Sequence, residues 1–388
     1  MPMTPFRIDI PQDTLDRIMA RVAAYRWFPA PENEETGWEY GMSTPVLKDI
    51  QAYWLDSYDW RAQETALNRY PQFRASVDGL DVHVLHVVGE AAGKRPLLIT
   101  HGWPGSVFEF WDVIEPLAYP SRHGGSASDA FDLVIPSLPG YGFSGKPPSP
   151  IGQRATARLW DTLMREVVGY DTYLAQGGDW GAVVTSWLGF GHSLAKGGGC
   201  RAIHLNMTGL RPTPATPQTD DEREWLGKTQ AAMQTEGTYL MQQAMKPQTL
   251  ALGLMDSPMG QAAWILEKFH AWSDLREKSL LEAYTRDQLL TNLMIYLVTD
   301  SFATSVWYYN ALFQEGGNGL PAGERCETPT TYAAFPGETV FSPPPRSWME
   351  RAYNLTGWQE QPRGGHFAAM EEPGLFVDAI RAWGRASG

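Results

Sequence analysis

The chain has 388 residues, 43% of them hydrophobic and 12% aromatic, which suits one large domain or a few smaller ones with an extensive core. Its formal net charge of −13 argues against nucleic acid and anionic membrane as partners. Cys200 and Cys326 lack disulfide or metal-site spacing, and neither a signal peptide nor an apolar run of about 18 residues is seen, so a cytoplasmic protein without a metal site or membrane span is predicted.

Two amphipathic helices are predicted before the first strand. Asp13 is the expected N-cap of a helix over 13–27, in which apolar residues recur with helical spacing. A second helix is predicted to start near Thr44 and Pro45, because a capping residue there precedes a proline suited to the first turn. Since both helices come before any strand pattern, residues 1–72 are expected to form a helical extension packed outside the core.

Strand and helix patterns alternate over residues 73–208. The segments 97–100 and 131–135 are short, continuous apolar runs, as expected of central parallel strands. Helical patterns over 107–117 and 155–168 separate the strand patterns. The alternation predicts βαβ units and a mostly parallel sheet, which would form the first part of an α/β core.

The alternation of strands and helices stops after Met207. Residues 209–318 have helical patterns without strands and are rich in Met, Trp and Tyr, and strand signals return at 330–335 and around Trp358. We therefore expect residues 209–318 to be a helical cap inserted into the core, with residues 319–388 as the second part of that core.

The stretch around Asp179 predicts an enzyme nucleophile. An apolar strand end runs into the turn Gly177-Gly-Asp-Trp-Gly181, which opens a helix. Glycines on both sides of the central residue let strand and helix pass close together and tolerate a strained backbone. This pattern is typical of the nucleophile elbow of the α/β-hydrolase fold, which presents one side chain above the sheet. An ordinary helix N-cap aspartate is the alternative interpretation.

An aspartate at an elbow narrows the chemistry. The aspartate carboxylate is already ionised near neutral pH, because its ordinary pKa is about 3.9. Such a carboxylate gains nothing by attacking an ester or amide. It suits displacement at a saturated carbon that carries a leaving group, such as an epoxide or an alkyl halide, and this leaves an ester on Asp179. Water must then attack the ester, so the chain should also supply a histidine base, an orienting acid and backbone N–H donors.

Seven motifs make the chain resemble the microsomal-type epoxide hydrolases over nearly its whole length. They are His101-Gly-Trp-Pro-Gly-Ser106, Pro139-Gly-Tyr-Gly-Phe-Ser144, Gly177-Gly-Asp-Trp-Gly181, Lys246-Pro-Gln-Thr249, Asp256-Ser-Pro258, Glu267-Lys-Phe269 and Gly364-Gly-His-Phe-Ala-Ala369. The resemblance implies an α/β-hydrolase fold with a mostly parallel central sheet, an inserted cap and an N-terminal helical extension. Without the membrane anchor of vertebrate members, the chain is similar to soluble bacterial-type members, some of which act in natural-product pathways such as enediyne biosynthesis.

The resemblance also implies a catalytic triad. Asp179 would be the nucleophile and His366 the base, and Glu338, which follows a Phe-Pro pair, would orient the histidine. Their order along the chain is the order expected for this fold. Asp300 and Glu315 are competing acids, but both fall within or beside the predicted cap. A purely structural role is the alternative for His366, and a solvated loop carboxylate is the alternative for Glu338.

Further donors are implied on both sides of the nucleophile. The backbone N–H groups of Trp103 and Trp180 would form the oxyanion hole. Two cap tyrosines of the family hold the epoxide oxygen, and these are placed at Tyr239 and Tyr309, the latter preferred over Tyr308. Ring opening leaves an alkoxide, which a phenol of pKa about 10 can hydrogen-bond and protonate. The sequence around the second tyrosine departs from the family's pattern, and packed cap aromatics are the alternative for both.

We therefore expect an epoxide hydrolase that forms a vicinal diol and uses no cofactor and no metal. Its partners would be a small-molecule epoxide and water, and sixteen tryptophans are compatible with a bulky or aryl epoxide. A role in secondary metabolism and a homodimer are further options that stay open. A haloalkane dehalogenase, which shares the elbow aspartate followed by tryptophan, is one alternative function, and a non-catalytic binder of the same fold is the other.

Overall fold

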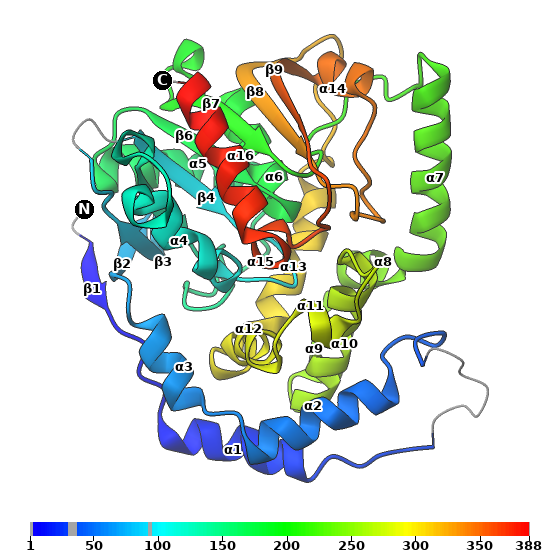
Figure 1. Cartoon of the computed structure of the whole chain (residues 1–388). Helices are drawn as coiled ribbons and strands as arrows, with labels where there is room; N and C mark the ends of the chain where they lie inside the picture. The colour runs from blue at the N-terminus through cyan, green and yellow to red at the C-terminus, as the bar shows by residue number, and fades with distance from the viewer. Residues whose placement is uncertain (1–2, 30–36, 92–94, 388) are drawn as a thin grey trace.

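The computed structural model describes residues 3–29, 37–91 and 95–387, and Figure 1 traces their path. Within these residues nine strands form one sheet. Their order across the sheet is β1 (Thr4–Phe6), β2 (Gln72–Val77), β3 (Leu80–Val87), β5 (Phe131–Pro136), β4 (Arg95–Thr100), β6 (Tyr173–Gly177), β7 (Cys200–Leu205), β8 (Cys326–Ala334) and β9 (Tyr353–Glu360).

The sheet is mostly parallel, as predicted. The pairs β5–β4, β4–β6, β6–β7, β7–β8 and β8–β9 are parallel, whereas β1, β2 and β3 add an antiparallel margin next to β5. The register places Thr100 at the end of β4 beside Gly177 at the end of β6. The loops that follow these parallel strands therefore leave the sheet at the same edge, which is where open α/β sheets place their ligands.

Helices cover both faces of the sheet. They are α4 (Trp111–Ala118), α16 (Pro373–Ala386), α5 (Gln153–Thr162) and α6 (Asp179–Gly191). The first two pack together on one face and the last two on the other. Within β4, Leu97 and Ile99 join the core of α4 and α16, whereas Leu98 joins the core of α5 and α6. Successive strand side chains point to opposite faces, so a strand covered on both faces requires a continuous apolar run.

A group of helices connects β7 to β8 and lies beside the sheet (Figure 1). They are α7 (Asp220–Glu236), α8 (Thr238–Met245), α9 (Pro247–Leu254), α10 (Pro258–Trp272), α11 (Leu280–Ala283), α12 (Arg286–Val298) and α13 (Phe302–Gln314). Thr285 and Gln288 start α12 with a reciprocal capping box. In the part of the chain that the structure describes, no single helix has the length and apolar character to cross a membrane. Only when α12 and α13 are taken together do they reach that length and apolar character, and these two helices are bent by 87° relative to one another.

The N-terminal helices pack against the cap. Both α1 (Gln12–Ala23) and α2 (Thr44–Asp56) contact α10 and α12, and Figure 1 shows them running beneath the cap. An ion pair of 2.7 Å joins Asp49 of α2 to Arg286 of α12. The extension therefore holds the cap from the side opposite the sheet.

The structure differs from the prediction for residues 1–72 in four details. The short strand β1 pairs with β2, so the extension also contributes to the sheet. The sequence did not predict β1, because three residues are too few to show the alternation of apolar and polar residues that marks a strand. The first helix ends at Ala23, and Asp13 lies within its first turn instead of at its N-cap. A further helix, α3 (Trp60–Leu67), begins after Asp59, whose side chain accepts two backbone N–H groups of its first turn.

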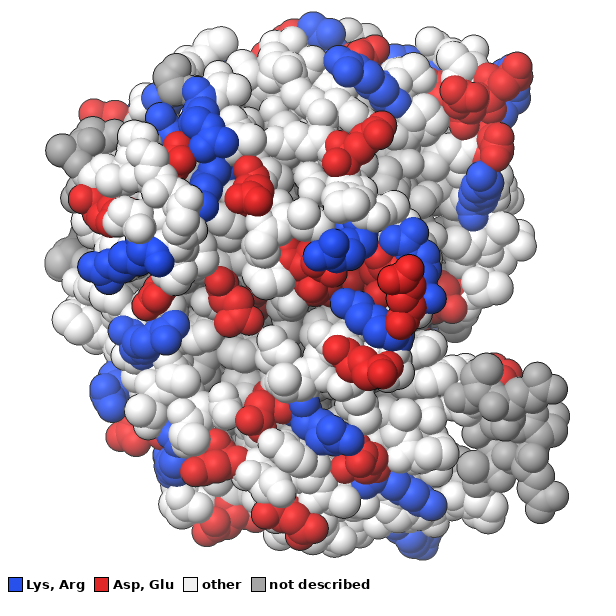
Figure 2. Space-filling model, in the orientation of Figure 1, with Lys and Arg blue, Asp and Glu red and all other residues white. Residues whose placement is uncertain are grey.

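Acidic and basic side chains are interspersed over the face seen in Figure 2. Several form ion pairs near the end of α10, such as Arg276 with Asp274 at 2.7 Å and Arg363 with Glu372 at 2.9 Å. Ion pairs between two exposed side chains contribute little to stability, whereas each of these pairs includes a largely buried carboxylate.

Candidate active site

A sharp turn between β6 and α6 carries Asp179. Its φ of 47° lies in the left-handed region, which non-glycine residues rarely adopt. A Cβ on Gly177 would lie 2.1 Å from the carbonyl oxygen of Gly181, and a Cβ on Gly181 would lie 1.9 Å from that of Thr100. Both positions therefore require glycine, and the strained turn presents the Asp179 side chain at the edge of the sheet.

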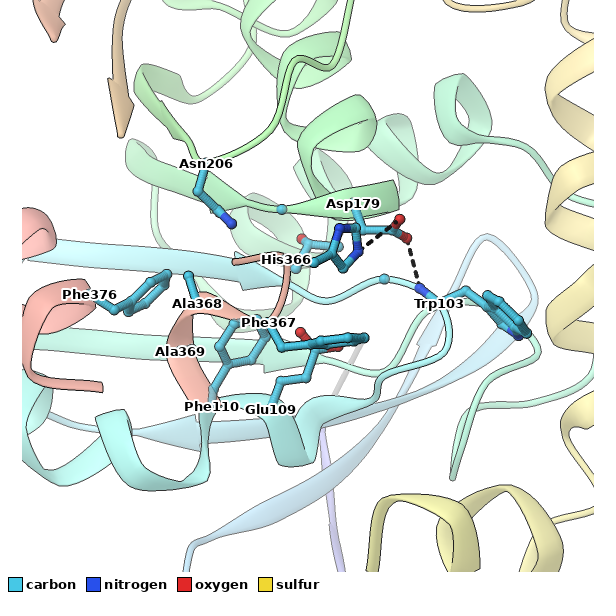
Figure 3. Close-up of a pocket in the computed structure, with 13 residues that line it drawn as sticks. Trp103, Glu109, Phe110, Asp179, Asn206, His366, Phe367, Ala368, Ala369 and Phe376 are labelled. Atoms are coloured by element: carbon cyan, nitrogen blue, oxygen red, sulfur yellow. Dashed lines mark hydrogen bonds and ion pairs between the residues drawn. The ribbon is translucent and has the colours of Figure 1, made fainter. Parts of the chain in front are cut away.

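His366 and Glu338 reach Asp179 from the loops after β9 and β8. The Nδ1 atom of His366 lies 2.5 Å from Oε2 of Glu338, and Nε2 lies 3.4 Å from Oδ2 of Asp179. Figure 3 shows the imidazole facing the Asp179 carboxylate. The other oxygen of Glu338 accepts the N–H groups of Val340 and Phe341, each at 3.1 Å. The structure thus brings the three predicted triad residues together, with Glu338 anchored by the backbone.

Hydrogen bonds from the cap and from Glu371 hold the loop that carries His366. The N–H of His366 donates to the carbonyl of Trp272 at the end of α10, at 3.0 Å. The Glu371 carboxylate accepts the N–H groups of Gly365 and Phe367, at 3.0 and 2.9 Å. Burial raises the pKa of Glu371 to about 7. No sequence pattern predicted a role for Glu371, although it lies only five residues after His366.

The ionisation of His366 depends on its two carboxylate neighbours. Burial alone would lower the pKa of this histidine, but the charges and hydrogen bonds of Glu338 and Asp179 outweigh burial and hold it well above 6.5. The imidazole is therefore protonated at neutral pH.

A backbone N–H group of the loop after β4 holds the Asp179 carboxylate. The Trp103 N–H donates to Oδ1 at 2.8 Å (Figure 3). Gly102 lies so close that a Cβ there would be 2.1 Å from the same oxygen. Trp180, the other predicted oxyanion residue, directly follows Asp179 in the first turn of α6. One carboxylate oxygen is thus hydrogen-bonded by the loop after β4, and the other faces His366.

The predicted tyrosines come from the cap. Tyr239 of α8 and Tyr309 of α13 have ring centroids 5.8 Å apart. Burial raises the pKa of both phenols well above 10, and the Asp179 charge adds to the effect, so both stay protonated. The Tyr309 hydroxyl forms no well-aligned hydrogen bond with a described residue, although it lies near that of Tyr239. The Tyr308 hydroxyl instead bonds with Thr156 at 2.5 Å, which leaves Tyr309 as the available donor.

Five rings form what we call the aromatic cluster: Trp103, Trp180, Tyr239, Trp272 and Tyr309. Trp103 stacks on Tyr239 at 5.5 Å, and Trp180 meets Tyr309 edge-on at 4.6 Å. Trp272 lies between Tyr239, at 5.0 Å, and His366, at 4.9 Å. The cluster joins the cap to the residues around Asp179. Sequence reasoning did not single out Trp272, which is one of many tryptophans in the chain.

A small cavity of about 10 Å³ adjoins Asp179 and His366 on the sheet side. Glu109, which the sequence analysis did not consider, also lines it, and Figure 3 shows this side chain below His366. Burial raises the pKa of Glu109 to about 8, while the charge of His366 opposes that shift. An acidic residue within the otherwise apolar run Val107-Phe-Glu-Phe110 is the signal that could have identified it.

The elbow, the parallel sheet and the inserted cap define an α/β-hydrolase. Residues 95–236 match the family model described as alpha/beta hydrolase fold, and residues 3–110 match the model described as epoxide hydrolase N terminus. Epoxide hydrolase 1 of Oryctolagus cuniculus is 36% identical, over 97% of this chain and 87% of the relative.

Solved structures agree with these matches. The structure of Aspergillus niger epoxide hydrolase has a TM-score of 0.85 and 29% identity, covering 100% of this chain and 97% of the other. Juvenile hormone epoxide hydrolase from Bombyx mori has a TM-score of 0.82 and 31% identity, covering 99% and 93%. The chain belongs to the epoxide hydrolase family.

Proposed function

We propose that this protein hydrolyses an epoxide to a vicinal diol through a covalent ester on Asp179. The observation that carries the proposal is the position of Oδ2 of Asp179, which lies 3.4 Å from the His366 imidazole while Oδ1 is held by the Trp103 N–H. One carboxylate thereby has a free nucleophilic oxygen, a neighbouring base and a donor for the oxyanion that forms later. The names of the relatives support an epoxide as the substrate.

The first step is alkylation. Oδ2 of Asp179 forms a bond to an epoxide carbon, the ring C–O bond breaks, and its electron pair passes to the epoxide oxygen. Tyr309, together with Tyr239, donates a hydrogen bond to that oxygen and gives it a proton. Because burial keeps both phenols protonated, the proton is available whenever substrate arrives.

Alkylation also changes His366 into a base. The ester on Asp179 carries no charge, so one of the two influences that raise the pKa of His366 disappears. The imidazolium then gives up its proton, which returns through water to the tyrosinate left by alkylation, and Nε2 can accept a proton from the attacking water. The same carboxylate therefore sets the order of the two steps.

The second step is hydrolysis of the ester. Water loses a proton to Nε2 of His366 while its oxygen bonds to the carboxyl carbon, and the carbonyl electron pair moves to Oδ1, which the Trp103 N–H stabilises. The tetrahedral intermediate then expels the diol oxygen, which takes the proton from His366. Asp179 keeps one oxygen that came from water and passes its remaining proton to His366, which restores the starting charges.

The experiment that tests this mechanism traps the ester. His366→Ala should alkylate but not hydrolyse, so incubation with styrene oxide should give a stable adduct on the Asp179 peptide, detected by mass spectrometry. His123→Ala, a partly exposed histidine outside the site, is the control and should turn over like the wild type. If turnover in ¹⁸O-water labels the diol only, and never Asp179, the covalent mechanism is wrong.

The substrate class follows from the walls of the site. The aromatic cluster places flat, apolar rings around Asp179, which suits a bulky or aryl epoxide. We propose that larger aryl epoxides have a higher kcat/KM than small aliphatic ones. Turnover of a panel that runs from propylene oxide through styrene oxide to stilbene oxide measures this preference, and a preference for the smallest member would contradict it.

One observation keeps haloalkane dehalogenation as a second candidate. The indole N–H groups of Trp103 and Trp180 are buried and have no hydrogen-bond partner among the described residues. Indole donors beside an aspartate nucleophile can stabilise a departing halide. Release of chloride or bromide from 1-haloalkanes, without turnover of epoxides, would favour this function over the first.

A further inference from the structure

A buried lysine adjoins the cap side of the site. Lys268 lies in α10, within the motif Glu267-Lys-Phe269, to which neither step of the proposed reaction gives a role. Its side chain is 8% exposed, and its Nζ lies 5.0 Å from the ring centroid of Tyr239 and 5.9 Å from that of Trp272. An aromatic ring attracts a cation out to about 6 Å. The ammonium therefore contacts one of the two tyrosines that bind the epoxide oxygen in the proposed reaction.

Two carboxylates pair with Lys268. Oε2 of Glu267 lies 2.7 Å from Nζ, and Oε2 of Glu236, the last residue of α7, lies 3.5 Å from it. Burial raises the pKa of Glu267, and the charge of Lys268 opposes that shift. Glu236 precedes Tyr239 by three residues, so one short segment carries both an acid and a phenol that the reaction uses. Lys268 is thus placed to offset negative charge next to Tyr239.

Most groups around the Tyr239 phenol oppose the loss of its proton. Burial has the largest effect and raises the pKa of this phenol well above 10, and the charges of Asp179 and Glu338 add to it. The charge of Glu236 raises the pKa further, whereas the nearby Tyr309 hydroxyl lowers it. A phenol that gives up a proton at this position needs a compensating cation, because a buried charge without a partner is costly.

Alkylation moves a negative charge towards Lys268. Asp179 loses its charge when it becomes an ester, and the epoxide oxygen gains that charge as the ring opens. When Tyr239 protonates this oxygen, the O–H bond of the phenol breaks and the charge ends on the phenolate. The cation beside the Tyr239 ring is attracted to the phenolate more strongly than to the phenol. Electrostatic stabilisation that grows during a step lowers the barrier of that step.

We propose that Lys268 is a positioning residue that makes Tyr239 the proton donor of the alkylation step. Its ammonium offsets the two neighbouring carboxylates and stabilises the phenolate that Tyr239 becomes. Tyr309 supplies the second hydrogen bond to the same oxygen. Lys268 has this role only if the proposed ester mechanism holds, because only that mechanism moves the Asp179 charge to a phenol.

The test separates the two steps in single turnovers with styrene oxide. Tryptophan fluorescence follows alkylation, and rapid quenching with mass spectrometry follows loss of the adduct. Lys268→Met removes the charge but keeps the length of the side chain. It should slow alkylation by about 10- to 100-fold and leave ester hydrolysis within about threefold of the wild type. Lys268→Arg keeps the charge and should retain more of the alkylation rate than the methionine variant.

A second substitution separates the charge of Lys268 from its packing. Glu236→Gln, added to Lys268→Met, removes a negative charge that the lysine had offset, so the double variant should alkylate at least about threefold faster than Lys268→Met alone. A loss of packing would not be restored in this way. Lys228→Met is the matched control, because this lysine is exposed on α7 and pairs with Glu224 at 2.6 Å, and it should leave both rates unchanged.

Three outcomes overturn the role of Lys268. They are alkylation by Lys268→Met at the wild-type rate, an equal loss in both steps, and a double variant no faster than Lys268→Met. If Lys268→Met does not fold, Glu236→Gln alone decides: it should alkylate faster than the wild type, and an equal or lower rate overturns the role. Absence of any adduct in the wild type and in His366→Ala would instead overturn the proposed mechanism itself.

Discussion

The two sides of the active site are held by different kinds of interaction. On the sheet side, Asp179, His366 and Glu338 are linked to one another and to backbone N–H groups by hydrogen bonds and close charges. On the cap side, Tyr239 and Tyr309 are held mainly by the packing of aromatic rings. Hydrogen bonds fix direction, whereas ring packing tolerates small shifts. The sheet side therefore suits atoms that react in one geometry, and the cap side suits substrates of differing shape.

The two sides meet at the end of α10. There the cap supplies the carbonyl of Trp272 to the N–H of His366, at 3.0 Å, and the carboxylate of Asp274 to the N–H of Gly364, at 2.9 Å. The cap thus holds the loop that carries His366. A displacement of the cap would first move His366, because the loop that carries His366 is hydrogen-bonded to both sides of the site.

The largest effect in this comparison is expected on the sheet side, from Glu338→Gln. The amide lacks the charge that raises the pKa of His366, so that pKa should fall, and its NH₂ group can face Nδ1 and disfavour the required tautomer. We expect kcat to fall by about 10²- to 10⁴-fold. Steady-state kinetics measure the loss, and ¹⁵N NMR of the imidazole measures the pKa.

The control for Glu338 is the competing acid, Glu315. Its carboxylate accepts the N–H groups of Arg154 and Ala155 at the start of α5, away from the triad. Glu315→Gln should leave kcat unchanged and should cost about 1 kcal/mol of stability at most. A comparable loss of kcat in both variants would show that Glu338 does not have a special role.

An intermediate effect is expected on the cap side, from Tyr309→Phe. Without this hydroxyl the epoxide oxygen keeps only Tyr239 as a donor, so the alkylation rate should fall by about 10- to 100-fold while hydrolysis of the ester changes little. Tyr308→Phe is the matched control, because its hydroxyl bonds with Thr156. It should leave alkylation within about twofold and lower stability by about 1 kcal/mol. Stopped-flow kinetics distinguish these outcomes, and the reverse order would assign the donor to Tyr308.

The sequence predicted most accurately what depends on short local patterns. Continuous apolar runs predicted the central parallel strands, and the glycines around Asp179 predicted the turn, because each constraint acts within a few residues. The three-residue strand β1 was missed, since its pairing with β2 depends on residues almost seventy positions away. The packing of α1 and α2 on the cap was missed for the same reason.

The residues of the site show the same division. Tyr308 and Tyr309 are adjacent on one helix, and only the partner of Tyr308, Thr156 on α5, shows which of them has a free hydroxyl. Glu109 and Glu371 lie within or beside recognised motifs, but their importance comes from burial and from backbone donors that only the folded chain assembles. Local pattern predicted Asp179 and the family resemblance predicted the residues that meet it, whereas the groups that position them depend on tertiary structure.

The smallest expected effect concerns stability at the junction of sheet and cap, through Glu371. Burial raises its pKa to about 7, from an ordinary value of about 4.5. Between these values the folded protein holds a proton that the unfolded chain has released, so this residue makes stability fall as pH rises, by at most about 1.4 kcal/mol per pH unit. Glu371→Gln cannot titrate. The free energy of unfolding of the variant relative to wild type should therefore increase between pH 5 and pH 7 in urea titrations, even if the amide is destabilising at every pH. If the free energies of unfolding of the two proteins instead change in parallel with pH, Glu371 is ionised throughout this range. The loop that carries His366 is then held by a charged carboxylate at every pH tested.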